Sequence, residues 1–489
     1  MTTEEIREYQ GVRLAAAEVA VLEALEAQLG RSISRVDEFD EDEEYWFGFI
    51  AEDTHIVELA LDNHELSSLP PNIETLSHLW LLRVTRTQLN SLPDNIDFLR
   101  SLEILQLWIN ELEALPAEIA HLHNLKVLDL SGNQLQAIPE TLGQLANLEF
   151  LDLGDNPLHT LPESLDQLSN LRYLHLYGIS LQVFPEWICN LQHLISLVLS
   201  ENELSRLSEP LGQLQSLENL DLGGNQLTTV PESLGQLQNL RHLDLSGNRL
   251  TTLPESLGQL HNLSYLDLSQ NSLMTVPESL GQLQRLEELW LGENQLTILP
   301  ESLGQLQSLQ ELDLSENQLT ILPESLGQLQ SLQELDLSEN QLAMVPESLG
   351  QLQRLEELWL GENQLAMVPE SLGQLQNLQG LSLERNLLKM LPLWITQLPN
   401  LQSLDIRENP LENSLTTLKI LLRAATSFEA WIPNKLITHP VVCPLEPSTL
   451  EYLSHSICPF CGAEGLMTGR DRKTSEERSF CAECENTVH

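Results

Sequence analysis

Leucine and asparagine recur along the chain in one pattern, LxxLxLxxNxL, with a period of 23 residues. The asparagine position falls on His64 and then on every 23rd residue through Asn409, fifteen steps later, which predicts sixteen repeats. His64, Thr87 and Ile179 depart from asparagine, and thirteen positions keep it: Asn110, Asn133, Asn156, Asn202, Asn225, Asn248, Asn271, Asn294, Asn317, Asn340, Asn363, Asn386 and Asn409. No insertion or deletion breaks this register, so we expect an array of stacked units.

Each repeat first alternates hydrophobic and polar residues and then spaces its leucines as a short helix does. The alternating part predicts a strand, with leucines such as Leu128 and Leu130 facing inward. The second part, such as LPESLGQLQSL at 299–309, places Pro300 at the first position of a short helical turn. The asparagine should bond backbone groups of its own turn and of the adjoining repeat. The expected fold class is an α/β repeat solenoid, with a curved parallel sheet on the concave face and short helices or 3-10 turns on the convex face.

One complete repeat, VPESLGQLQNLRHLDLSGNRL at 230–250, resembles the Ras-group leucine-rich repeats of scaffold and polarity proteins. The resemblance covers about three quarters of the chain. It implies a leucine-rich-repeat fold and a scaffolding function, often with small GTPases or phosphatase complexes. Binding residues vary between members of this group, so the resemblance assigns none here.

The segments outside the repeats divide the chain further. Residues 1–55 contain an apolar helical segment over 14–29 and are expected to form an N-terminal helical cap, followed by the repeats at 56–411. We expect a capping helix at 412–432, because a solenoid must cover its terminal core. Residues 433–457, with four prolines, are expected to be a linker with a short helix, and 458–489 form a separate small module.

The charge is strongly acidic, with 24 Lys and Arg against 72 Asp and Glu and a formal net charge of -48. Such a chain repels nucleic acid and anionic membranes and favours a basic partner. The same excess of acid would also arise from copying an acidic repeat, or from adaptation to a salt-loving host. The N-terminus resembles no signal peptide and no apolar run is long enough for a membrane span, so we expect a monomeric, cytoplasmic protein.

Four of the six cysteines form two CxxC pairs, Cys458 with Cys461 and Cys481 with Cys484, separated by nineteen residues. This spacing is typical of a tetrahedral zinc site, and CPFCG resembles a zinc-ribbon knuckle, although the second knuckle, CAECE, lacks the usual glycine. Four thiolates leave no open position, so we expect structural Zn and not catalytic Zn. A rubredoxin-like iron site is the less favoured alternative.

Aromatic residues interrupt the repeat pattern at two places on the expected sheet face. Trp290 and Trp359 replace the usual aspartate and are accompanied by Glu288 and Glu357, which is typical of binding hot spots. A second group comprises Trp108, Phe150, Tyr173, His175 and Tyr177. The alternative interpretation is that both groups merely cover the sheet, and that the aspartates at this position serve the fold.

No nucleophile with its base and no phosphate-binding loop is recognisable, and the segment LEELWLGENQL occurs twice, at 286 and 355. Such copying argues against a unique catalytic arrangement, so we expect no enzyme. The leading hypothesis is a scaffold or adaptor that binds a protein, with small-GTPase or signalling complexes among the candidate partners. The alternatives are a redox module carried on a repeat scaffold and a ubiquitin-ligase effector, for which no catalytic domain of adequate size follows the repeats.

Overall fold

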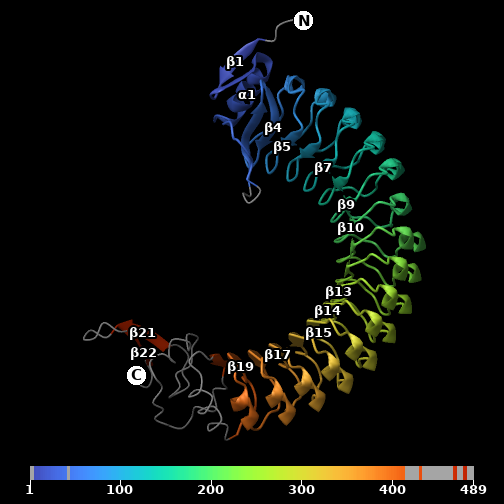
Figure 1. Ribbon diagram of the computed structural model, residues 1–489, viewed down its shortest axis with the longest axis vertical. Helices are drawn as coiled ribbons and strands as arrows, with labels where there is room; N and C mark the ends of the chain where they lie inside the picture. Colours follow the sequence, from blue (N-terminus) through green and yellow to red (C-terminus); the bar gives the residue numbers. More distant parts are fainter. Residues whose placement is uncertain (1–4, 41–44, 413–428, 432–465, 471–476, 482–489) are drawn as a thin grey trace. The chain divides into compact units, whose positions relative to one another are not determined.

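The computed structural model describes residues 5–40, 45–412, 429–431, 466–470 and 477–481. The chain divides into two compact units, Met1–Arg249 and Leu250–His489. In each unit the strands line one side and the 3-10 helices line the other (Figure 1).

The first unit begins with a hairpin, a helix and one antiparallel strand. Strands β1 (Ile6–Tyr9) and β2 (Val12–Ala15) precede helix α1 (Ala16–Leu29), and β3 (Phe47–Glu52) pairs antiparallel with β4 (His55–Leu61). The predicted helix is present, but it starts at Ala16, because Leu14 belongs to β2. The cap is therefore not purely helical: β3 pairs with β4, the strand of the first repeat, and bonds its backbone groups.

The remaining strands of the first unit pair in parallel from β4 to β12, one per repeat. They are β5 (Leu81–Arg83), β6 (Ile104–Gln106), β7 (Val127–Asp129), β8 (Phe150–Asp152), β9 (Tyr173–His175), β10 (Ser196–Val198), β11 (Asn219–Asp221) and β12 (His242–Asp244). The 3-10 helices are η1 (Ile73–Thr75), η2 (Asp94–Phe98), η3 (Ala117–His121), η4 (Glu140–Gln144), η5 (Glu163–Gln167), η6 (Glu186–Asn190), η7 (Glu209–Gln213) and η8 (Glu232–Gln236).

The second unit repeats this arrangement, with parallel pairing from β13 to β20. Its strands are β13 (Tyr265–Asp267), β14 (Glu288–Trp290), β15 (Glu311–Asp313), β16 (Glu334–Asp336), β17 (Glu357–Trp359), β18 (Gly380–Ser382), β19 (Ser403–Asp405) and β20 (Glu429–Trp431). The 3-10 helices are η9 (Glu255–Gln259), η10 (Glu278–Gln282), η11 (Glu301–Gln305), η12 (Glu324–Gln328), η13 (Glu347–Gln351), η14 (Glu370–Gln374) and η15 (Leu393–Gln397).

The C-terminal predictions fall mostly outside the described residues. Of the predicted capping helix at 412–432, residues 429–431 form strand β20 instead, which extends the parallel sheet by one strand. The linker at 433–457 lies outside the described residues. Strands β21 (Leu466–Arg470) and β22 (Glu477–Cys481) form an antiparallel hairpin between the two predicted cysteine knuckles.

The core of each repeat consists of its leucines. In the repeat that carries β15, Leu306, Leu309 and Leu314 are fully buried. Pro300 lies one residue before η11 in an extended conformation, not at its first helical position, and its carbonyl accepts the amide of Leu303. Proline fits there because it supplies a fixed φ and needs no donor of its own.

A ladder of buried asparagines links neighbouring repeats, as predicted. The Asn317 side chain donates to the carbonyl of Leu291 in the preceding repeat at 2.9 Å and accepts the amide of Leu296 at 2.9 Å. At Ile179 the ladder is interrupted, and the amide of Leu158 bonds the carbonyl of Asn156 instead. The asparagines therefore satisfy turn groups that would otherwise be buried without partners.

Candidate protein-binding surface

The outward-facing strand residues of the second unit form columns across neighbouring strands. The middle residue of each strand, such as Leu289 or Leu335, is fully buried, so the first and third residues face the opposite side. The register places Glu288, Glu311, Glu334 and Glu357 next to one another on β14 to β17. We call these four residues the glutamate ladder.

The third residues of the same strands form a parallel column: Trp290, Asp313, Asp336 and Trp359. The structure thus places all four predicted residues of this region, Glu288, Trp290, Glu357 and Trp359, on one stretch of sheet. It adds Glu311 and Glu334, which the sequence reasoning did not single out. Their signal was the unbroken run of glutamate at one position of four successive repeats.

The aspartates of this column have a structural task. Asp336 accepts the amide of Ser338 at 2.8 Å and its hydroxyl at 2.6 Å, and Asp313 accepts the amide of Ser315 in the same way. Such bonds stabilise the turn that follows the strand. Tryptophan cannot accept these bonds, so Trp290 and Trp359 do not stabilise the turn in this way. The Trp290 indole N–H instead donates to Glu288 at 3.4 Å.

Electrostatic repulsion accumulates along the glutamate ladder. Burial raises the pKa of Glu311, and the neighbouring Glu288 and Glu334 raise it further. The pKa of Glu357 is raised by burial first and then by Glu334 and Glu356. Within 250–412, all of which the structure describes, no ion pair includes a ladder glutamate.

A third acidic column lies at the turn after each strand. Glu293, Glu316, Glu339 and Glu362 all adopt left-handed backbone conformations, with φ between 52° and 53° at three of them and 50° at Glu316. Gly132, at the equivalent position, has a φ of 64°. A non-glycine residue in this region costs roughly 1 kcal/mol, so these glutamates reduce the stability of the fold.

The acidic columns end where arginines begin. Arg385 forms ion pairs with Glu362 and Glu408, and Arg407 pairs with Glu384 and Asp405. The glutamate ladder on β14 to β17 therefore lies outside these ion pairs. At its edge, the Glu357 carboxylate reaches into the space left by the missing side chain of Gly380 on β18.

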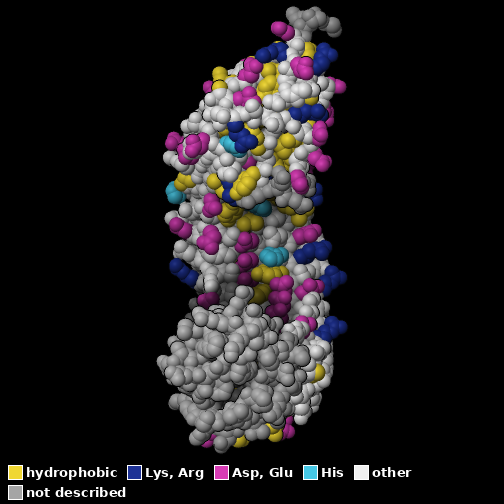
Figure 2. Space-filling model, turned by 90° about the vertical axis from the view of Figure 1, so that its left-hand side faces the viewer, with side chains coloured by type: hydrophobic (Ala, Val, Ile, Leu, Met, Phe, Trp, Pro, Cys, Tyr) yellow, Lys and Arg dark blue, Asp and Glu magenta, His cyan; other side chains and the backbone are white. Residues whose placement is uncertain are grey.

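The aromatic group of the first unit separates into parts. The ring centroid of Phe150 lies 5.2 Å from that of His175, in an edge-on contact, and 6.3 Å from that of Tyr173. These three side chains therefore form one cluster. His175 Nδ1 lies 3.3 Å from an oxygen of Asp152. Tyr177 lies over Gly154, whose missing side chain makes room for the ring. Figure 2 looks onto the strand side and shows acidic, hydrophobic and histidine side chains close together.

Trp108 belongs to a different group, which could not be recognised from the sequence. The guanidinium of Arg83 lies 5.6 Å from the Trp108 ring and 4.5 Å from Trp46, and Arg86 lies 5.2 Å from Trp108. Arg86 also donates to the Tyr45 hydroxyl at 3.0 Å. These cation–π contacts hold Trp108 against the first repeats. Within the predicted group, Trp108 thus contacts arginines, whereas Phe150, Tyr173 and His175 contact one another.

The predicted metal ligands cannot be placed. Cys458, Cys461 and Cys484 lie outside the described residues, and Cys481 ends β22 with its side chain not described. Among the described residues no helix combines the length and the apolar character that a membrane crossing requires.

A stack of strand-and-turn repeats with an open, side-chain-rich strand face defines a protein-interaction domain. Residues 231–421 match the family described as leucine-rich repeat region, and 100–158 and 180–227 match the one described as leucine rich repeat. A leucine-rich-repeat protein of Leptospira interrogans is 38% identical, with a TM-score of 0.69 over 75% of this chain and 93% of its own. The chain belongs to the leucine-rich-repeat family.

Two further solved structures are similar. One is the ectodomain of a plant membrane receptor kinase from Arabidopsis thaliana in complex with Casparian strip integrity factor 2, at 31% identity and a TM-score of 0.58, covering 71% of this chain and 47% of that one. The other is an internalin from Listeria monocytogenes, at 27% identity and a TM-score of 0.57, covering 63% and 88%. A comparison with curated proteins found no match. The matching families are binding domains, and none is a family of enzymes.

Proposed function

We propose that this protein is a non-enzymatic scaffold whose partner places a segment rich in Lys and Arg on the glutamate ladder. The observation that carries the proposal is the run of four glutamates on β14 to β17, bordered by Trp290 and Trp359, with no ion pair to any ladder residue within 250–412. A cationic segment would relieve the repulsion that raises the pKa of Glu311 and Glu357.

The tryptophans suit the same partner. Three strand spacings separate Trp290 from Trp359, which corresponds to roughly 14 Å, about the reach of four or five extended residues. Indole rings bind ammonium and guanidinium groups and also cover the aliphatic stems of Lys and Arg. A basic segment lying across the ladder would contact both rings at once.

The family supports binding but leaves the partner open. The plant receptor ectodomain was solved with Casparian strip integrity factor 2. Another similar chain, 26% identical, was solved with a single-stranded RNA, but a net charge of -48 disfavours nucleic acid here. A small GTPase in a signalling complex is the partner class that the Ras-group resemblance implies, and one with a basic surface segment fits the ladder.

A defined peptide tests this proposal. A Lys/Arg-rich peptide of about ten residues should bind the full chain, with an affinity that falls as salt rises, and a Glu-rich peptide of equal length should not. The Trp290→Ala/Trp359→Ala double variant should bind at least about 30-fold more weakly, since the loss of even one hot-spot residue costs about 2 kcal/mol or more. A Glu311→Gln/Glu334→Gln variant should also lose binding.

The matched control is Glu324→Gln/Glu347→Gln, which removes the same charge from the 3-10 helices on the opposite side of the unit. Equal losses in the two charge variants would mean that net charge alone attracts the peptide. Unchanged binding by the double tryptophan variant would exclude this surface.

We also propose that the C-terminal module holds structural Zn through Cys458, Cys461, Cys481 and Cys484. Its support is the CxxC spacing together with the antiparallel hairpin of β21 and β22 between the knuckles. Metal analysis of the purified chain separates this proposal from the redox alternative. Iron with a visible absorption band would favour a rubredoxin-like site.

A further inference from the structure

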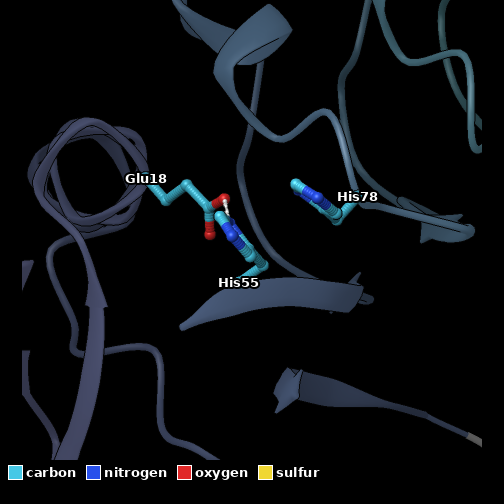
Figure 3. A group of neighbouring side chains, drawn as sticks. All are labelled: Glu18, His55 and His78. Atoms are coloured by element: carbon cyan, nitrogen blue, oxygen red, sulfur yellow. Dashed lines mark hydrogen bonds and ion pairs between the residues drawn. The ribbon is translucent and has the colours of Figure 1, made fainter. Parts of the chain in front are cut away.

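Three side chains from separate parts of the N-terminal region converge on one point (Figure 3). Glu18 comes from α1, His55 from the start of β4, and His78 from the turn between η1 and β5. One donor atom from each lies within 4.8 Å of the other two. We propose that Glu18, His55 and His78 bind a divalent transition-metal ion of the zinc type, which cross-links α1 to the start of the repeat array.

Glu18 is a carboxylate in an unusual place. Its side chain is 2% exposed, on the face of α1 that packs against the repeats with Val19 and Leu22. One of its oxygens accepts a hydrogen bond from His55 Nδ1 at 2.8 Å, and the other accepts the amide of Ile56 at 2.7 Å. Burial raises the pKa of this carboxyl, and His55 partly counteracts that effect. A cation bound beside it would stabilise the charged form.

His78 departs from the repeat pattern. His55 and His78 are 23 residues apart and occupy one repeat position, where most other repeats carry Asn or Ser. There the side chain commonly donates to a carbonyl 24 residues earlier, as Ser101 does to Ser77 and Asn124 to Arg100. The His78 ring instead stacks on His55, with 3.8 Å between ring centroids. Two imidazoles are thereby brought to the buried carboxylate.

The donor set suits zinc. Imidazole nitrogen and carboxylate oxygen are ordinary zinc ligands at about 2.0–2.2 Å, and three protein ligands leave a fourth position for water. Donors around one tetrahedral ion lie roughly 3.3 Å apart. His78 is exposed and lies on a turn, so its ring can rotate to close the remaining distance without disturbing the core. His55 Nδ1 and a Glu18 oxygen lie 2.8 Å apart in a hydrogen bond, and the ion would replace the proton between them.

The ion would fasten the cap to the array. Apart from core packing, a 3.5 Å contact from the Thr75 hydroxyl to the carbonyl of Ala17 connects η1 to α1. A metal bridge would add a bond that the unfolded chain lacks, so binding would stabilise this end of the solenoid.

The test uses the full chain, stripped of metal with a chelator and titrated with Zn²⁺. His78→Asn installs the residue that many other repeats carry and should bind one zinc fewer than the wild type, or bind it at least about tenfold more weakly. The cysteines are unchanged in this variant, so the difference reports on the new site alone. His193→Asn is the matched control, because His193 is exposed at the same repeat position in another repeat.

A local measurement completes the test. Zinc should slow amide hydrogen exchange in α1 and at the start of β4 in the wild type and in His193→Asn, but not in His78→Asn. Circular dichroism without metal should show that all three proteins are equally folded. Equal zinc stoichiometry and affinity in the wild type and His78→Asn, or no zinc-dependent protection of α1 in the wild type, would overturn the proposal.

Discussion

Replacing Asn317 by alanine should destabilise the second unit more than its small change in volume suggests. The Asn317 side chain accepts the amide of Leu296 and donates to the carbonyl of Leu291, each at 2.9 Å, and the residue is 7% exposed. Alanine leaves the Leu296 amide buried without a partner, whereas the Leu291 carbonyl keeps a bond from the Asn294 side chain at 3.2 Å. An unsatisfied buried group costs about 1–3 kcal/mol, which is the expected loss.

Asn377 provides a matched control within the same unit. Its side chain also donates to a backbone carbonyl, that of Gln353, at 2.7 Å, but it is exposed, so water can replace the lost bond. Asn377→Ala should therefore cost less than about 1 kcal/mol. Urea unfolding followed by circular dichroism gives the global difference.

Repeat arrays can unfold in parts, which makes a local measurement necessary. Native-state hydrogen exchange should show faster exchange at the Leu296 amide in Asn317→Ala. If Asn317→Ala costs no more than Asn377→Ala and the Leu296 amide stays protected, the asparagine ladder does not stabilise the array.

Three further predictions concern acidity and packing. Glu316→Gly should raise the free energy of unfolding, measured in urea, by about 0.5–1 kcal/mol, because glycine removes the left-handed strain. Burial and neighbouring glutamates raise the pKa of Glu311, so the folded state binds a proton at this carboxyl more tightly than the unfolded state does. The free energy of unfolding should therefore increase as the pH falls from 7 through that raised pKa. Binding of the basic peptide should weaken over the same pH range. Gly154→Ala should cost about 1–3 kcal/mol by collision with the Tyr177 ring, and adding Tyr177→Ala should recover most of that loss.

Each of the three has a result that would contradict it. A less stable Glu316→Gly variant would show that the side chain makes a contact that outweighs the strain. Peptide affinity that stays constant as the pH falls from 7 through the raised pKa of Glu311 would show that the ladder carboxylates do not bind the peptide. If the free-energy effects of the Gly154 and Tyr177 substitutions are additive in a double-mutant cycle, the two residues do not interact, which contradicts the predicted collision.

The period predicted most of the architecture. Because consecutive repeats stack in register, residues 23 positions apart become neighbours. The strand pairing confirms this, since Trp290 lies next to Asp313 and Glu288 next to Glu311. The bonds of Asn317 to the adjoining repeat followed from the same regularity. The period also related His55 to His78, but Glu18 stands outside it, so the metal-ligand group could not be recognised from the sequence.

The non-repeating segments were predicted less well. Strand β3 pairs with β4 where a helical cap was expected, and β20 occupies residues of the predicted C-terminal helix. The contacts of Trp108 with Arg83 and Arg86 were not predicted, because these arginines lie at repeat positions that carry no general preference for arginine. Which neighbouring side chains contact each other depends on the directions in which they point. The repeat period does not predict these directions.

By itself, therefore, the sequence determined the repeat fold, its register and the columns of acidic and aromatic residues on the strand face. These features depend on contacts between adjacent repeats. Because the period is constant, residues 23 positions apart contact each other, and the sequence alone identifies them. Tertiary structure alone decided how α1 docks, which carboxylates are buried deeply enough to raise their pKa, and which aromatic rings the arginines engage. Each of these depends on packing between segments that share no period, so physical contact and not sequence spacing determines it.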